Sequence, residues 1–132
     1  EDRREKEGGR EESFAKLGKK PSGKTRKGMK VLVEEGSGMM AEDGPASVID
    51  AGLSAAAQRV EHYEMAGYGV VRTFASVLGE DDAQETLQET LDEEGAADKK
   101  LTEIAEGTVN DDAEDEEKMK PAAKKKTASR RR

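Results

Sequence analysis

Four carboxylates lie where two stretches of the chain should present apolar side chains to a core. Glu61 and Glu64 interrupt the apolar stripe of an alanine-rich stretch, and Glu94 and Asp98 interrupt the stripe of the next one. Burying a carboxylate costs free energy unless a metal, a proton or a cation compensates the charge. The four residues are therefore candidate metal ligands. The alternative is that their carboxylates reach solvent at the edge of the fold or are protonated.

The two stretches that carry these carboxylates are predicted to be helices over residues 45–78 and 80–106. Apolar residues in the first recur every three or four positions, which indicates one buried face. Pro45 suits the first turn of a helix and Gly79 is expected to end it. A weaker helix is predicted over residues 24–42. Together these elements predict an all-α fold, in which a long antiparallel helical hairpin packs with one short helix.

The position of Gly79 sets the expected register of this hairpin. Glu64 and Glu94 lie equally far along the chain from Gly79, and Glu61 and Asp98 lie almost equally far from it. Residues equidistant from a hairpin turn come to the same height, so we expect all four carboxylates in one acidic layer. Facing helices that project carboxylates inward build di-iron and di-manganese sites, because oxygen ligands suit these metals. If a metal compensates this layer, iron or manganese is the expected cofactor; the alternative of acids that reach solvent stays open at this point.

Two further side chains near this layer are candidates for the site. His62 and Tyr68 are predicted either to bind the metal directly or to contact its ligands. A lone histidine on a helix is also common at a protein surface. Because the chain has one histidine and no cysteine, it lacks the ligands for a zinc site that needs two histidines or thiolates from one chain. The sequence contains neither a Ser-His-Asp pattern nor a phosphate-binding loop, so it does not indicate a hydrolytic enzyme.

Composition limits the chain to one small domain with a thin core. Of the 132 residues, 40% are charged, 33% are hydrophobic and 3% are aromatic. No apolar run approaches the roughly 20 residues of a membrane-spanning helix, and no signal peptide is visible. We therefore expect a soluble, cytoplasmic protein with no membrane contact.

The two ends of the chain are expected to be disordered. Residues 1–13 are almost entirely charged, and residues 108–132 contain an acidic run followed by a basic tail. The helical domain is accordingly predicted over residues 14–107. The basic tail is a candidate for weak contact with nucleic acid or an acidic partner through phosphate or carboxylate neutralisation. Its cations are Lys124, Lys125, Lys126, Arg130, Arg131 and Arg132. The alternative is a solubilising tail that folds back on the acidic run.

Two segments, AAQRVEHYEMAGYG and TLDEEGAADKKL, carry a resemblance that extends over residues 17–106. This region resembles the YciE/YciF family of bacterial ferritin-like proteins. The resemblance implies a ferritin-like four-helix bundle, a di-metal centre, a link to stress responses and a tendency to dimerise. By position, Glu61 and Glu64 correspond to the third helix of the family's bundle, and Glu94 and Asp98 to the fourth.

The same resemblance implies that half of the bundle is missing from this chain. Family members begin with two long helices, and the residues before Phe14 are too few and too charged to replace them. One expectation is a homodimer, in which two hairpins form four helices and rebuild the site with two copies of the four carboxylates. The other expectation is an inactive truncated remnant that acts, if at all, as a non-catalytic interaction protein. Enzyme activity is not expected of this chain alone.

Overall fold

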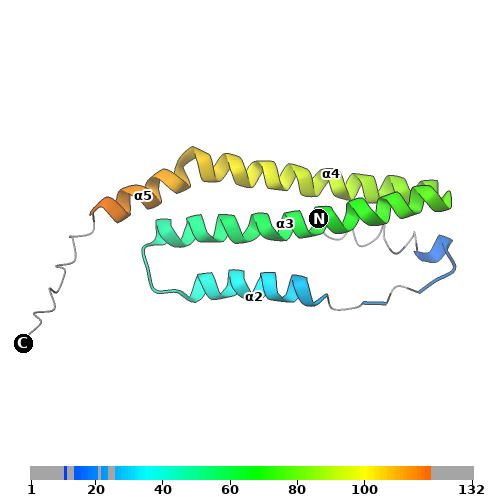
Figure 1. Cartoon of the computed structure of the whole chain (residues 1–132), viewed down its shortest axis with the longest axis horizontal. Coiled ribbons are helices and arrows are strands. Elements are labelled where there is room, and N and C mark those ends of the chain that lie inside the picture. The colour runs from blue at the N-terminus through cyan, green and yellow to red at the C-terminus, as the bar shows by residue number, and fades with distance from the viewer. Residues whose placement is uncertain (1–10, 12–13, 21, 24–25, 120–132) are drawn as a thin grey trace, which may run out of the picture.

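The computed structural model describes residues 11, 14–20, 22–23 and 26–119, and these contain helices and no strand. The elements are α2 (Lys27–Ala41), α3 (Ala46–Leu78), α4 (Asp81–Ile104), the π-helical segment η1 (Ala105–Val109) and α5 (Asn110–Met119). In Figure 1, α3 and α4 form a long hairpin, and α2 lies along the opposite side of α3. The predicted all-α fold, with a long antiparallel hairpin and a short packing helix, is confirmed.

The hairpin turns at Gly79, as the sequence predicts. Gly79 adopts the left-handed conformation with φ 72°, which a residue without a Cβ atom reaches at little steric cost. Its amide donates to the carbonyl oxygens of Ala75 and Ser76 and so satisfies the end of α3. Asp81 and Asp82 then occupy the first turn of α4, where negative charge interacts favourably with the helix dipole. This turn fixes the register between the two helices.

Two glycines allow α2 to approach α3 closely. A Cβ atom on Gly28 would lie 2.8 Å from the ring of Tyr63, and one on Gly52 would lie 2.6 Å from the sulfur of Met39. Each glycine faces a large side chain of the other helix, so a larger residue would require that side chain or the helix itself to shift. The short helix is therefore held along the first half of α3 by complementary small and large side chains.

The acidic run after Gly107 is helical, and the prediction that it is disordered is wrong. The chain passes through η1 and continues as α5 to Met119, so Gly107 does not end the helical domain. A π-helical turn shifts the register of a helix, and Figure 1 shows the change of direction between α4 and α5. In its new direction α5 contacts α3, where Ser47 donates a hydrogen bond to Glu116. The charge pattern alone did not reveal this packing.

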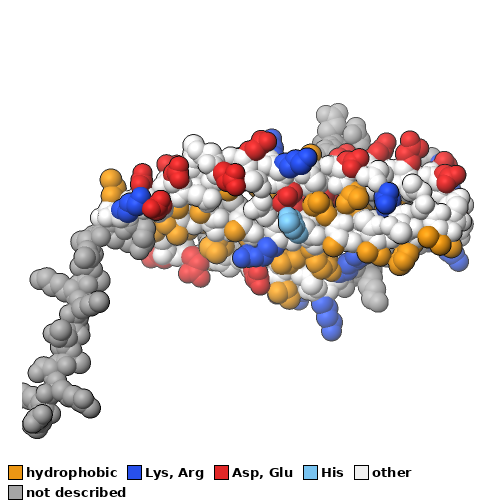
Figure 2. All heavy atoms as spheres, turned by 45° about the horizontal axis from the view of Figure 1, so that its top comes forward, with side chains coloured by type: hydrophobic (Ala, Val, Ile, Leu, Met, Phe, Trp, Pro, Cys, Tyr) orange, Lys and Arg blue, Asp and Glu red, His pale blue; other side chains and the backbone are white. Residues whose placement is uncertain are grey.

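The core of the described part of the chain is thin. Its buried hydrophobic residues are two alanines, Ala56 and Ala75. Figure 2 shows hydrophobic side chains on the surface among the helices, with acidic side chains along the edge formed by α4. Among the described residues, no helix combines the length and the apolar character needed to cross a membrane. The expected disorder of residues 1–13 concerns a segment that, apart from residue 11, lies outside the described residues.

Candidate metal centre

Three carboxylates from two facing helices meet between α3 and α4. Glu61 and Glu64 lie one turn apart on α3, and Glu94 projects from α4 toward them. One oxygen of each residue lies within 4.8 Å of the corresponding oxygens of the other two. Glu94 is buried, with 8% of its surface exposed, and Glu61 and Glu64 are half-buried. We call Glu61, Glu64 and Glu94 the carboxylate cluster.

The register around Gly79 explains why these three residues meet. The hairpin turn brings Glu64 and Glu94 to the same height, as their equal separation from Gly79 predicts. A spacing of three residues then places Glu61 on the same face of α3 as Glu64. The cluster is thus a consequence of helix period and turn position.

The chemistry of the carboxylate cluster fits a hard divalent cation. Like charges at such short distances repel one another, and burial strengthens the repulsion. A cation relieves that repulsion, and oxygen-only donors suit iron, manganese and magnesium rather than softer metals. The donor oxygens lie within 4.8 Å of one another, a limit only a little above the roughly 4.2 Å that separates opposite ligands at about 2.1 Å from one ion. The residues present therefore fit a metal ion.

Asp98, the fourth predicted member of the acidic layer, pairs with other side chains. Its Oδ1 accepts a hydrogen bond from His62 Nε2 at 3.0 Å and another from Gln58 Nε2 at 3.3 Å. Gln58 also donates to Thr102 Oγ1 at 2.7 Å. Asp98 lies about one turn beyond Glu94, where α3 presents Gln58 and His62 rather than a second carboxylate. The structure thus brings together three of the four predicted ligands and places Asp98 in a neighbouring polar network.

The other predicted site residues lie around the cluster or outside the described chain. His62 is largely exposed, with 67% of its side chain accessible, and it pairs with Asp98, which lies next to the carboxylate cluster. Tyr68 lines a pocket together with Glu64. The basic residues of the tail, from Lys124 to Arg132, lie outside the described residues. Sequence reasoning missed Gln58, although its position one turn before Glu61 and His62 puts it on their side of the helix.

Fold and site together define an all-α protein with a long helical hairpin and a carboxylate cluster between its two helices. A family model described as "Domain of unknown function (DUF892)" matches residues 10–114. The chain belongs to this family.

The relatives are YciF-type proteins, as the resemblance in the sequence predicts. The chain is 48% identical over 86 residues to protein YciF of Escherichia coli (strain K12). This alignment covers 65% of this chain and 52% of that protein. The crystal structure of the E. coli stress protein YciF superposes with a TM-score of 0.66 at 43% identity, over 70% of this chain and 58% of that chain. The structure of YcfI from Rhodopseudomonas palustris superposes with a TM-score of 0.71 at 38% identity, over 75% of this chain and 63% of that chain. The predicted membership of the YciE/YciF family is confirmed.

The extent of these matches also describes the chain. It spans about half the length of the curated relative that it matches. The matched region includes the helices that carry the carboxylate cluster, since the family model extends from residue 10 to residue 114.

Proposed function

We propose that this chain is a ferritin-like, metal-binding module of a stress protein and that it binds iron or manganese. The observation that supports this proposal is the carboxylate cluster, three acidic side chains gathered within 4.8 Å in a chain otherwise poor in buried groups. The likeness to the stress protein YciF supports the link to stress. Glu61, Glu64 and Glu94 would hold the ion, and Asp98 would stay outside its ligands.

A bound iron or manganese ion would supply Lewis acidity and, for a redox-active ion, one-electron chemistry. The residues of the chain have their own parts in this proposal. Glu94, the most buried of the three carboxylates, would hold the ion between the helices from α4. Glu61 and Glu64 supply charge from α3. The Asp98 network with Gln58 and His62 holds the neighbouring turn in place.

The metal proposal predicts different effects for cluster and neighbouring carboxylates. Glu64→Gln removes a charge from the cluster and is expected to weaken Mn²⁺ binding more than about tenfold. Loss of a group that only supports a ligand costs about 10–100-fold in metal affinity, and loss of a ligand should cost at least as much. Asp98→Asn is expected to change it less than about threefold. Glu89→Gln, at an exposed acid of α4, is the matched control. Calorimetric titration with Mn²⁺ measures all three.

Two results of this titration would contradict the proposal. Equal affinity in wild type and Glu64→Gln would show that the cluster does not hold the ion. A loss in Asp98→Asn as large as that in Glu64→Gln would mean that the acidic layer acts as the four-residue unit expected from the sequence.

We also propose that the chain forms a homodimer through the outer face of α3. Among the described residues, large hydrophobic side chains are exposed on the second half of this helix, beyond the beginning of α2. Three of them, Val70, Phe74 and Val77, lie on one side of α3. A shallow groove of about 350 Å³ runs beside them, and a Cβ atom on Gly69 would meet only open space there. This face carries few charges, so a second copy with the same net charge of −7 can approach it.

The geometry of α3 determines what such a dimer would share. Val70 and Val77 lie about 120° and about 140° around the helix from Glu64, because each residue advances about 100° around the axis. A dimer through this face therefore leaves each carboxylate cluster within its own chain. It differs in this respect from the dimer expected from the sequence, in which two copies rebuild one common site.

A charge on the proposed dimer face should separate the two copies. Val70→Glu is expected to give the mass of a monomer in light scattering after size exclusion, because a carboxylate would be buried at the contact. Val31→Glu is the control, since Val31 on α2 is exposed to a similar extent, 51% against 53%. A wild-type monomer, or a dimer that persists in Val70→Glu, would contradict the proposed interface. Mn²⁺ binding per chain is expected to stay unchanged in both variants.

A further inference from the structure

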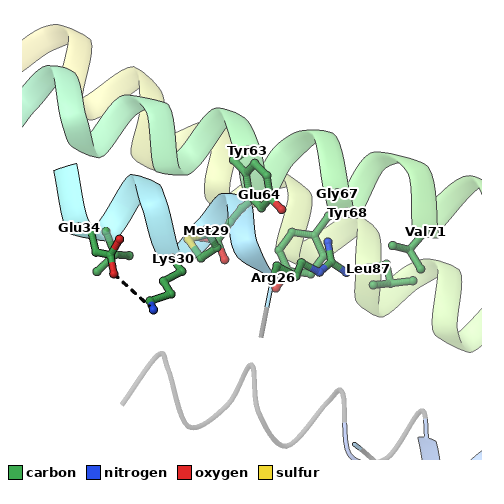
Figure 3. Close-up of a pocket in the computed structure, with 11 residues that line it drawn as sticks. Arg26, Met29, Lys30, Glu34, Tyr63, Glu64, Gly67, Tyr68, Val71 and Leu87 are labelled. Carbon is green, nitrogen blue, oxygen red and sulfur yellow. Dashed lines mark ion pairs between the residues drawn. The ribbon is translucent and has the colours of Figure 1, made fainter. Parts of the chain in front are cut away.

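A pocket of about 790 Å³ opens between the beginning of α2 and the middle of α3. Figure 3 shows side chains from both helices around it, with Leu87 reaching it from α4. Its volume lies within the range of about 300–1,000 Å³ that is typical of small-molecule sites. The pocket shares Glu64 with the carboxylate cluster, but most of its wall belongs to other residues.

The wall of this pocket is mainly apolar. Met29 from α2, Val71 from α3 and Leu87 from α4 contribute aliphatic surface. The ring of Tyr68 adds an aromatic face with a hydroxyl group at its end. Such a wall favours the hydrocarbon part of a ligand, because apolar surface removed from water contributes about 25 cal/mol per Å².

A cationic side chain stands at the mouth of the pocket. A Cβ atom on Gly67 would lie 3.3 Å from Arg26 Nη1, so the glycine leaves room for the guanidinium beside α3. Figure 3 shows Arg26 close to Tyr68. Within the described residues Arg26 forms no ion pair, whereas the nearby Lys30 pairs with Glu34 at 3.5 Å. An arginine is thus available beside an apolar wall in a chain whose net charge is −7.

The charges of the pocket limit the ligand to a single negative charge. A guanidinium binds a carboxylate through two parallel hydrogen bonds. Glu34 and Glu64 also line the pocket, and they would repel a group with two negative charges, such as a phosphate monoester. A carboxylate with a hydrocarbon body meets both requirements.

The terminal segments of this chain do not have that chemistry. Residues 1–10 contain no hydrophobic side chain, and residues 120–132 are rich in Lys and Arg, which Arg26 would repel. We therefore propose that the pocket is a binding site for an amphipathic carboxylic acid, whose carboxylate contacts Arg26 and whose hydrocarbon body covers Met29, Val71 and Leu87. The site requires no metal, so it goes beyond the proposed metal-binding function.

The test uses decanoate as the probe and metal-free full chain with labelled methionine methyl groups. Titration followed by NMR is expected to shift the Met29 methyl signal saturably, while that of Met119, which is 84% exposed, stays in place. Arg26→Gln is expected to weaken decanoate binding by about tenfold or more, as loss of a charge-assisted hydrogen bond does. Arg26→Lys should retain part of the affinity, and it keeps the test informative if the glutamine variant is unstable. Lys27→Gln, an exposed cation outside the pocket, is the matched control.

Three outcomes would overturn the inference. Shifts that never saturate, or that appear equally at Met119, would indicate non-specific association. Equal affinity in wild type and Arg26→Gln would show that the pocket does not recognise the carboxylate. A Met29 shift that follows protein concentration without decanoate would show that a second copy fills the pocket. Because the protein is metal-free, each outcome leaves the metal proposal to its own titration.

Discussion

At the scale of single residues, the two acids of α4 differ in what α3 places opposite them. Glu94 meets two carboxylates, whereas Asp98, about one turn further on, accepts hydrogen bonds from Gln58 and His62. Equal separation from Gly79 predicted the height of these side chains well. It did not predict which partner each one selects, because that depends on side-chain direction around the helix.

A second residue-scale contact ties the start of the described chain to α4 and leads to a prediction on pH. Lys16 donates a 2.8 Å hydrogen bond to Asp82, and this bond together with the lysine charge lowers the pKa of Asp82 below its ordinary value of 3.8. A lowered pKa means that the contact contributes stability above pH 3.8, and that this contribution is lost as pH falls through the lowered pKa. Lys16→Gln is therefore expected to raise the pKa of Asp82, measured by NMR titration of its carboxyl carbon.

The control for this titration is Lys19→Gln, which removes an equal charge from the same segment without removing the hydrogen bond. It should leave most of the lowering of the Asp82 pKa in place. If the two variants raised this pKa equally, the lowering would come from the general charge of the segment rather than from the contact with Lys16.

At the scale of elements, helix α2 is positioned by close approach rather than by a large apolar face. Its contact with α3 depends on Gly28, which fits beside the ring of Tyr63. The sequence predicted this helix from its apolar residues and counted its glycines as a cost in helix propensity. The structure explains why a glycine occurs here despite its low helix propensity, because the absence of a side chain at Gly28 allows the Tyr63 ring to pack against α2.

Two glycine substitutions in α2 should therefore have opposite effects on stability. Gly28→Ala gains helix propensity but forces a Cβ atom against the Tyr63 ring, and we expect a net loss of about 1–2 kcal/mol. Gly38→Ala meets no atom within 4 Å and should gain up to about 1 kcal/mol. Urea unfolding followed by circular dichroism measures both changes. A gain in Gly28→Ala equal to that in Gly38→Ala would show that the approach of α2 is not tight.

Some elements could be predicted from the sequence and others could not. The long helices and the turn at Gly79 follow from apolar period and glycine, which are local properties. Helix α5 depends on contact with α3 and on the π-helical turn that redirects the chain. The charge pattern of residues 110–117 shows neither this contact nor this turn. The acidic run was therefore predicted to be disordered.

At the scale of the whole molecule, the chain combines an acidic charge with a thin core and three features on α3, of which the carboxylate cluster and the pocket share Glu64. The inner face of this helix carries Glu61 and Glu64, its side toward α2 lines the pocket, and its outer face exposes hydrophobic residues. The family resemblance predicted the membership and the helical architecture. The pocket was not predictable from sequence, because its wall joins residues from three helices.

The most direct test of the central claim is to locate a metal ion in crystals grown with Mn²⁺, by anomalous diffraction. The proposal predicts a strong anomalous peak among the carboxylates of Glu61, Glu64 and Glu94. It also predicts that this peak is absent in crystals of Glu94→Gln grown in the same way. A well-diffracting wild-type crystal with no peak at this position, or with peaks only at exposed acids such as Glu89, would contradict the claim that the cluster is a metal site.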